Sequence, residues 1–174
     1  GRSFESLFPG EAEARAAGNA PAPALSVDDL CTEPHVQGVG LSVAPGEIVG
    51  LYGLVGAGRT ELCNAIFGAA RRSGTVAVDG RIVVAGDTRA AVEAGIGYIT
   101  EDRKGEGLIL DDSVRRNLAL PSLDRRRRLG VVDGSAEEAA TADIRDRLAV
   151  KTASLETPVV QLSGGNQQKV VVGK

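Results

Sequence analysis

The sequence is poor in aromatic residues and cysteine, and it has no tryptophan or methionine. Cys31 and Cys63 lack the paired spacing of metal sites and disulfide frameworks, so both are interpreted as reduced packing residues of a cytosolic protein. No apolar run approaches the roughly 20 residues that a membrane span needs. The balance of 20 Lys and Arg against 23 Asp and Glu gives no net positive charge for binding nucleic acid. These absences argue against a disulfide scaffold, a membrane-spanning protein and a nucleic-acid partner.

Glycine, by contrast, is abundant, with 23 residues in a chain whose 174 residues suffice for one ordinary domain. Tight loops around a ligand and plain turns would both explain this number. Residues 1–23 are rich in Ala, Glu, Gly and Pro and have no sustained apolar period, which predicts a linker.

Strands are predicted where the linker ends. Short alternating or apolar runs occupy 25–30, 39–44 and 47–53, and each is typical of a strand. A turn at Pro45-Gly46 separates the second run from the third. The third run leads directly into a glycine-rich loop, so the sequence predicts a strand that feeds this loop.

Helical spacing follows the loop. Residues 60–67 have apolar side chains at helical intervals, and Gly68 stands where a helix would end. Two β-branched runs then meet at Asp79-Gly80, which predicts a hairpin. The later elements are predicted from the same patterns: a helix over 88–94, a strand over 97–100, a mostly helical stretch over 113–151 with a break at Asp133-Gly134, and a helix opened by Ser163-Gly164-Gly165.

The glycine-rich loop has the pattern of a phosphate-binding loop. Gly53 to Thr60 reads G-x-x-x-x-G-R-T, with a predicted strand before it and a predicted helix after it. Glycines let backbone N–H groups turn toward a phosphate, and the helix start adds a favourable dipole. Thr60 is expected to offer its hydroxyl to Mg²⁺. The predicted ATP-binding residues of the loop and helix start are Gly53, Val55, Gly56, Ala57, Gly58, Arg59, Thr60 and Glu61.

Arg59 departs from the usual pattern, which has lysine at this position. A planar guanidinium can fork onto phosphate oxygens, but it does not reproduce the compact charge of an ammonium group. We therefore expect binding to survive better than hydrolysis. Two other interpretations stay open: a chance glycine-rich turn, and a dinucleotide-binding loop with Asp79 about 20 residues after it as the acidic residue. Arg59-Thr60 at the helix start fits a phosphate loop better.

The segment Leu162 to Gln168 reads LSGGNQQ, a string that average residue usage would produce at a given position on the order of once in a billion. It resembles the signature motif of ATP-binding-cassette (ABC) ATPases, and its NQQ ending resembles the bacterial sugar-importer branch of the ribose, galactose and xylose type. The resemblance implies that Ser163 and Gly165 face the γ-phosphate of an ATP molecule held by a partner domain. Gly164 and Gln167 are predicted to join them. Ser163 is also expected to cap the helix.

The resemblance runs from about Leu25 to Lys174. It implies an α/β fold, namely an incomplete P-loop NTPase domain of the ABC type with an antiparallel β subdomain and a helical subdomain. The expected parts are the β subdomain and P-loop core over 24–111, the helical subdomain over 112–161, and the signature motif with its helix start over 162–174. The linker-like start resembles the segment between two cassettes, which favours the second cassette.

The family pattern continues after the signature into a strand that ends in an Asp and a catalytic Glu, then a dimerisation loop and a switch His. This sequence stops before them, so we expect a domain truncated after the signature motif, with negligible hydrolysis on its own.

The stretch GIGYITEDRKGEGLILDDSVRRNLAL resembles the same branch. Glu101 falls where most cassettes have a Gln that senses Mg²⁺ and contacts the membrane subunit. It is therefore predicted as the catalytic residue and, with Thr60, as a metal ligand. The rest of the charged run 101–104 and the arginines of 125–128 are expected to be solvated. His35 lies near the position where many cassettes stack an aromatic ring on adenine. No aromatic residue stands at that position, so the way in which adenine would be packed stays open.

The resemblance as a whole implies an ATP- and Mg²⁺-binding module that energises sugar import from the cytoplasmic face of the membrane. The expected partners are a second nucleotide-binding domain in the same subunit or in a second copy, transmembrane permease subunits and, indirectly, a periplasmic or extracellular sugar-binding protein. The alternative is a regulatory half that binds nucleotide without turnover and completes the partner's site. A dinucleotide-dependent oxidoreductase would leave LSGGNQQ unexplained, and the sequence does not name the sugar.

Overall fold

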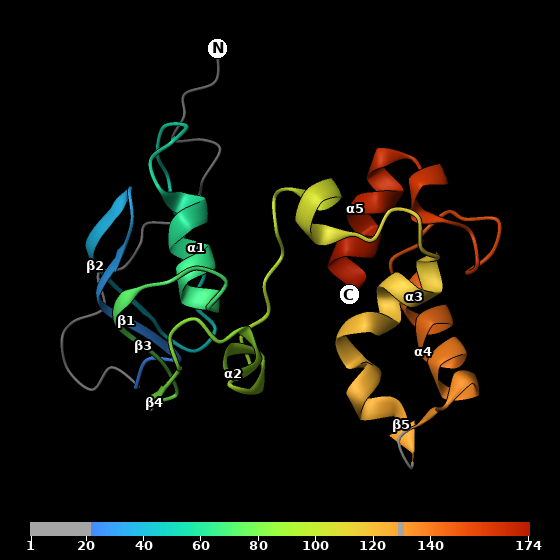
Figure 1. Ribbon diagram of the computed structural model, residues 1–174, viewed down its shortest axis with the longest axis horizontal. Helices are drawn as coiled ribbons and strands as arrows, with labels where there is room; N and C mark the ends of the chain where they lie inside the picture. The colour runs from blue at the N-terminus through green and yellow to red at the C-terminus, as the bar shows by residue number, and fades with distance from the viewer. Residues whose placement is uncertain (1–21, 129–130) are drawn as a thin grey trace. The chain divides into compact units, whose positions relative to one another are not determined.

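The computed structural model describes residues 22–128 and 131–174, so the predicted linker lies almost wholly outside the described residues. The chain divides into two compact units, 1–97 and 98–174 (Figure 1). The predicted boundary between the β and helical parts, at 111/112, therefore falls inside the second unit. None of the helices in the described part is both long and apolar enough to span a membrane.

The first unit contains an antiparallel sheet of four strands, in the order β2-β1-β3-β4. Its strands are β1 (Leu25–Thr32), β2 (Val36–Val43), β3 (Ser73–Val78) and β4 (Arg81–Ile82). The predicted strands over 25–30 and 39–44 correspond to β1 and β2. The predicted antiparallel β part is thus confirmed.

The predicted hairpin is also confirmed, because Val78 of β3 pairs with Arg81 of β4 across a two-residue turn. Asp79 has a φ of 48° and Gly80 a φ of 75°. Two central residues with positive φ are typical of the tight turn that matches the twist of the flanking strands.

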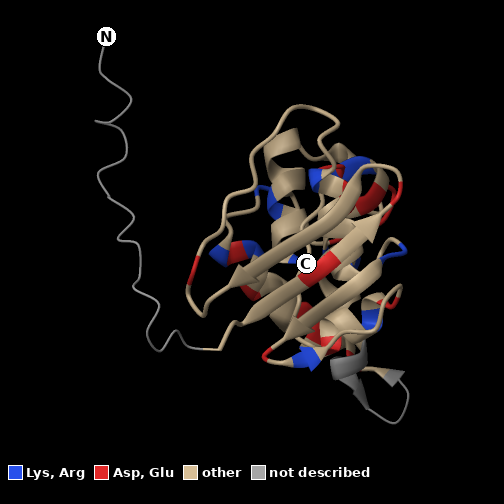
Figure 2. Ribbon diagram, turned by 90° about the vertical axis from the view of Figure 1, so that its left-hand side faces the viewer, with Lys and Arg blue, Asp and Glu red and all other residues tan. Residues whose placement is uncertain are grey.

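Two helices complete the first unit, α1 (Arg59–Phe67) and α2 (Thr88–Glu93), close to their predicted ranges. Figures 1 and 2 show the sheet along one side of α1. The helix buries Leu62, Ala65 and Ile66 in a core that it shares with Val27 and Leu30 of β1. This packing fixes the start of α1, and with it the end of the glycine-rich loop.

Two predicted strands are not formed. Residues 47–53 and 97–100 have no strand assignment, and the side chains of Ile48 and Tyr52 are 97% and 99% exposed. An apolar run of this kind suits a strand buried on both faces, and a strand requires a hydrogen-bonded neighbour. No described segment pairs with either run, so neither forms a ladder.

The second unit is mostly helical, as predicted for 113–151. Its elements are a π-helical turn η2 (Arg103–Gly107), α3 (Val114–Ala119), the 3₁₀ segment η3 (Leu120–Arg126), the hairpin strands β5 (Arg127–Arg128) and β6 (Val131–Val132), α4 (Gly134–Arg147), the 3₁₀ turn η4 (Val159–Gln161) and α5 (Gly164–Gly173). The small hairpin was not predicted. The side chains of the arginines over 125–128 lie outside the described residues.

The predicted break at Asp133-Gly134 is the start of α4. The Asp133 side chain accepts hydrogen bonds from the backbone N–H groups of Ser135 and Ala136, at 3.1 and 3.2 Å. These bonds favour the ionised carboxylate and lower the pKa of Asp133. Asp133 is therefore an N-cap rather than a helix breaker.

The core of the second unit combines apolar side chains with one buried amide. Val114, Leu118 and Val170 are each at most 1% exposed. Asn117 is fully buried, and it accepts a hydrogen bond from the Ile109 N–H and donates one to the Ile109 carbonyl, both at 2.9 Å. Because its polar atoms are paired, the amide fixes the loop before α3 without an unsatisfied group.

Candidate phosphate-binding site

The glycine-rich loop forms a tight turn that runs into α1. The Ala57 N–H donates to the Leu54 carbonyl at 3.0 Å, and the Leu62 N–H donates to the Gly58 carbonyl at 2.9 Å. Gly56 and Gly58 have φ values of 82° and 83°, a region that L side chains rarely adopt. The backbone N–H groups at the start of α1 therefore follow two left-handed glycines, as a phosphate cradle requires.

Glycine is favoured at each of the three glycine positions of the loop for a different physical reason. A Cβ atom on Gly58 would lie 3.1 Å from Val36 Cγ2 and 3.3 Å from the His35 carbonyl oxygen. On Gly53 it would lie 3.0 Å from Ala57 Cβ. On Gly56 it would meet nothing within 4 Å, so there the positive φ alone favours glycine and the loop stays open to a ligand.

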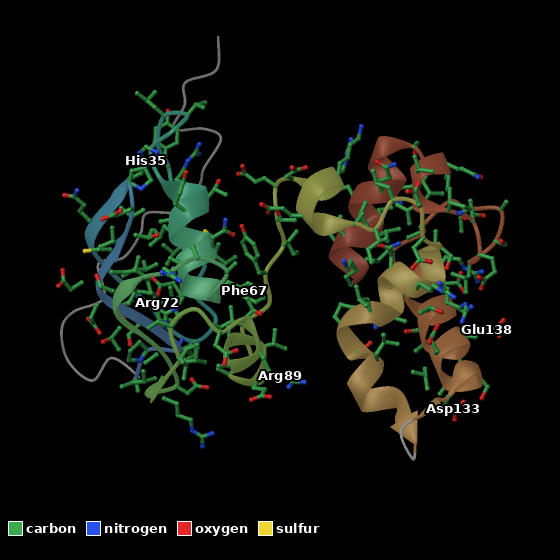
Figure 3. All side chains as sticks on the ribbon, viewed as in Figure 1. His35, Phe67, Arg72, Arg89, Asp133 and Glu138 are labelled. Carbon is green, nitrogen blue, oxygen red and sulfur yellow. The ribbon has the colours of Figure 1, made fainter. Side chains whose placement is uncertain are left out.

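A pocket of about 340 Å³ adjoins the loop. It is lined by His35, Val36, Gln37, Val39, Leu51, Tyr52, Ala57, Gly58, Arg59 and Leu62. Figure 3 shows His35 in the first unit, near the start of α1. The lining of the pocket combines apolar side chains with polar ones and the cation of Arg59, which suits a ligand that has both an apolar part and a negative charge.

The predicted loop side chains are mostly turned outward. Val55, Ala57, Arg59 and Thr60 are exposed, and Glu61 is half-buried in the first turn of α1. Within the described residues, Arg59 forms no ion pair and no side-chain hydrogen bond. Its guanidinium is therefore not engaged by any described group of the chain.

The described residues contain no group of three or more His, Cys, Asp or Glu side chains arranged to hold a metal ion. Mg²⁺ in nucleotide sites is held by one or two protein groups together with substrate phosphates. The exposed hydroxyl of Thr60, beside the open loop, fits such a site.

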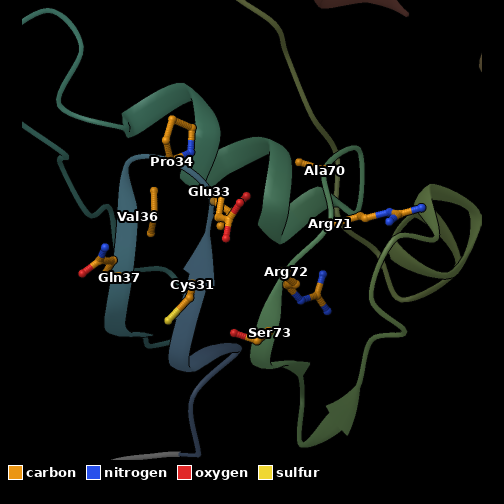
Figure 4. Close-up of a pocket in the computed structure, with 10 residues that line it drawn as sticks. Cys31, Glu33, Pro34, Val36, Gln37, Ala70, Arg71, Arg72 and Ser73 are labelled. Atoms are coloured by element: carbon orange, nitrogen blue, oxygen red, sulfur yellow. The ribbon is translucent and has the colours of Figure 1, made fainter.

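A larger hollow in the first unit, of about 650 Å³, does not involve the loop. Figure 4 shows its lining, which includes Cys31, Glu33, Arg72 and Ser73. Arg72 donates to the carbonyls of Ala65 and Val83 at 2.7 and 2.6 Å, and burial lowers the pKa of its guanidinium. The side chain therefore links α1 to the segment directly after β4.

The signature segment starts α5, as predicted. Ser163 occupies the N-cap position, but its side chain makes no capping hydrogen bond, which corrects the predicted cap. Its hydroxyl instead accepts a hydrogen bond from Asn166 Nδ2 at 3.0 Å. The Asn166 Oδ1 atom accepts one from the Lys151 N–H at 2.9 Å. The exposed hydroxyl is thus oriented by its neighbour and keeps its own proton for donation.

The other predicted signature residues differ in their surroundings. Gly165 is exposed in the first turn of α5, and a Cβ atom there would meet nothing within 4 Å. Gly164 lies against the guanidinium of Arg103. Gln167 is only 5% exposed and donates to the Val159 carbonyl at 3.1 Å. This inward position gives Gln167 a packing role and does not suit the predicted nucleotide contact.

The charged run 101–104 is a mostly exposed turn, as expected, with Arg103 partly buried. Glu101 is exposed, as a ligand-binding carboxylate would be. Asp102 accepts from the Lys104 and Gly105 N–H groups at 3.1 and 2.9 Å. Arg103 donates to the Gly164 carbonyl at 3.0 Å. This contact could not be predicted from the sequence, because the two residues stand 61 positions apart and no local pattern links them.

The dinucleotide interpretation is not supported by the position of Asp79. This residue lies in the tight turn between β3 and β4 with a positive φ, where the hairpin accounts for it. The structure thus leaves two groups of candidate residues, the loop Gly53 to Thr60 in the first unit and the start of α5 in the second.

Comparison with known proteins adds relatives of high similarity. The ribose import ATP-binding protein of Corynebacterium glutamicum is 43% identical over 175 residues, which cover 100% of this chain and 32% of the relative. A second ribose import ATP-binding protein, from Streptomyces coelicolor, is 47% identical over 175 residues, covering 100% of this chain and 33% of its own length. The chain thus spans about a third of the length of these relatives.

Solved structures share the fold. A dimeric ATP-binding cassette in a post-hydrolysis state, bound to ADP and Pi, has a TM-score of 0.69 and 21% identity over 86% of this chain and 67% of that one. A nucleotide-free cassette from an ABC transporter has a TM-score of 0.66 and 19% identity over 87% and 63%. These likenesses confirm the predicted ABC-type P-loop fold class. The model of the ABC transporter family matches residues 36–174, and the chain therefore belongs to this family.

Proposed function

We propose that this chain is an ATP-binding module of a bacterial sugar importer. It holds the phosphates of Mg·ATP in the loop Gly53 to Thr60 and presents Ser163 and Gly165 to a nucleotide held by a second cassette. The observation that carries the first part is the open loop with two left-handed glycines at the start of a nine-residue helix. The ribose import relatives support the sugar class.

The same relatives support a larger assembly. Because they are about three times as long as the matched segment, we propose that the chain is part of a longer subunit with two cassettes, of which it forms the second. Transmembrane permease subunits, a sugar-binding protein and a place on the cytoplasmic face of the membrane follow from this proposal. Glu101 is proposed to sense Mg²⁺ and to contact the permease.

The Thr60→Ala variant tests the ATP site. We expect Mg·ATP affinity, measured by calorimetry on the complete subunit with its other site disabled, to fall by about tenfold, or about 1.4 kcal/mol. The physical reason is the loss of a hydroxyl ligand to Mg²⁺. With EDTA in place of Mg²⁺, variant and parent should bind ATP equally.

Thr88→Ala is the matched control for Thr60→Ala. Thr88 is also an exposed threonine in the first turn of a helix of the first unit, but it lies in α2, away from the loop. We expect its loss to leave Mg·ATP affinity unchanged. Equal binding by the Thr60→Ala variant and the parent in Mg²⁺ would show that the loop does not hold the metal-bound nucleotide.

Arg59 is the basis of a finer proposal, that this site binds ATP but hydrolyses it weakly. The exposed guanidinium can fork onto phosphate oxygens, whereas the usual lysine supplies a point charge. We expect Arg59→Lys, in the complete subunit with its partner site disabled, to raise steady-state phosphate release about tenfold. Efficient turnover by the parent in the same assay would exclude the alternative of a purely regulatory half.

A further inference from the structure

The π-helical turn η2 lies along α5 and is joined to it at both ends. Arg103, the first residue of the turn, donates to the Gly164 carbonyl at 3.0 Å. Gly107, its last residue, accepts from Lys174 Nζ at 2.8 Å, and burial lowers the pKa of that ammonium group. Gly107 also packs against the side of α5, because a Cβ atom on it would lie 3.2 Å from Val171 Cγ2. The turn and the helix thus form one packed unit.

The Arg103 side chain packs closely against Gly164. A Cβ atom on Gly164 would lie 3.0 Å from Arg103 Nη2, 3.3 Å from Nη1 and 3.4 Å from Cζ. The guanidinium therefore lies flat against the backbone of Gly164. This close approach favours glycine at position 164. No described residue lies near the Cβ position of Gly165, so packing does not favour glycine there.

The first turn of α5 is held from a second direction as well. The Asn166 Nδ2 atom donates to the Ser163 hydroxyl, and the Asn166 Oδ1 atom accepts from the Lys151 N–H. Arg103 and Asn166 thus fix the two residues on either side of Gly165, while Gly165 itself has open space around it. The first turn of α5 is thus held by bonds around an open glycine.

The charge of Arg103 is unusual at this place. A cation beside a helix N-terminus opposes the helix dipole, so the position is unfavourable for the helix by itself. An anionic group that approached Gly165 would offset this cost, because it would be attracted by both the guanidinium and the helix start. Among the described residues Arg103 bonds the Gly164 carbonyl and forms no ion pair with a carboxylate, so an anion at Gly165 would offset the cost of this charge.

We infer that Arg103 is the positioning residue of the signature loop. It holds Gly164 so that Ser163 and Gly165 meet the phosphate of the nucleotide on the second cassette, and in this respect the inference rests on the proposed function. The π-helical turn serves as the support that delivers Arg103 to the start of α5.

The test uses Arg103→Ala in the complete two-cassette subunit. We expect kcat for ATP hydrolysis to fall by about tenfold or more, with the Kd of Mg·ATP at the Gly53 to Thr60 loop unchanged. Without nucleotide, hydrogen exchange at the amides of 166–168 should quicken by a similar factor, since the first turn of α5 loses its support. Arg103→Lys, which retains one donor and the charge, should restore most of both.

Lys174→Ala is the matched control, because it removes a side-chain bond between the same two elements at the opposite end. We expect it to leave kcat and the exchange at 166–168 unchanged. Equal losses in both variants would reduce Arg103 to a packing residue and overturn the inference. Unchanged exchange in Arg103→Ala would also overturn it. A parent that fails to bind ATP would contradict the proposed function, while the exchange measurement would still decide the role of Arg103.

Discussion

Replacing Gly165 by alanine is expected to stabilise the protein and to abolish its ATP-driven activity. Gly165 has no positive φ, lies in the first turn of α5 and has nothing within 4 Å of the Cβ position. Alanine in a helix is favoured over glycine by about 1 kcal/mol. No described residue thus gives a reason for glycine here, whereas the proposed close approach of a phosphate would.

The expected loss of hydrolysis is large. A methyl group at Gly165 would displace a phosphate that the loop is proposed to meet, and a misplacement of about 1 Å can lower a rate by on the order of 10²-fold. We would measure phosphate release by the complete subunit together with its melting temperature. The combination of a higher melting temperature and lost turnover separates a ligand contact from a folding defect.

Gly134→Ala provides the matched control for Gly165→Ala. Gly134 is also an exposed glycine at the start of a helix of the second unit, with nothing within 4 Å of its Cβ position. Its replacement should raise the melting temperature by a similar amount and leave hydrolysis at the parental rate. Parental hydrolysis in the Gly165→Ala variant would show instead that no phosphate approaches this glycine.

Elements defined by local patterns could be predicted from the sequence. The turn signal at Asp79-Gly80 placed the hairpin, because both residues adopt the positive φ that such turns need. Helical spacing and Gly68 placed α1 and its end, where Gly68 has a φ of 81°. The glycine-rich loop leads into α1, so its junction with the helix could be predicted, whereas the strand predicted directly before it is not formed.

Features that depend on distant partners could not be predicted. The run over 47–53 has strand-like residues, but a ladder requires a neighbour that local sequence does not specify. The Arg103 contact joins segments 61 positions apart. Gln167 is the exception, since its spacing from Val170 and Val171 places all three on one buried face of α5 and could have shown that it points inward.

Replacing Gly74 by alanine is expected to cause the largest loss of stability of any of the substitutions considered. Gly74 lies in β3 with a φ of 79°, and a Cβ atom would clash with the Asp29 carbonyl oxygen and lie 2.6 Å from that of Asp28. Both contacts are to backbone, at the register shift between Asp28 and Cys31. A left-handed alanine costs about 1–2 kcal/mol and overpacking about 1–3 kcal/mol, so we expect about 3 kcal/mol in total.

Gly80→Ala separates the two causes of this loss. Gly80 has nearly the same backbone conformation, with a φ of 75°, but nothing lies within 4 Å of its Cβ position. We expect it to lose only the conformational part, about 1–2 kcal/mol, in urea unfolding followed by circular dichroism. The difference between the two variants then measures the close approach of β1 and β3. Equal losses would mean that β1 shifts at its irregularity between Asp28 and Cys31 to make room for the Cβ atom. The close approach of β1 and β3 would then not fix the sheet on which α1 and the phosphate loop rest.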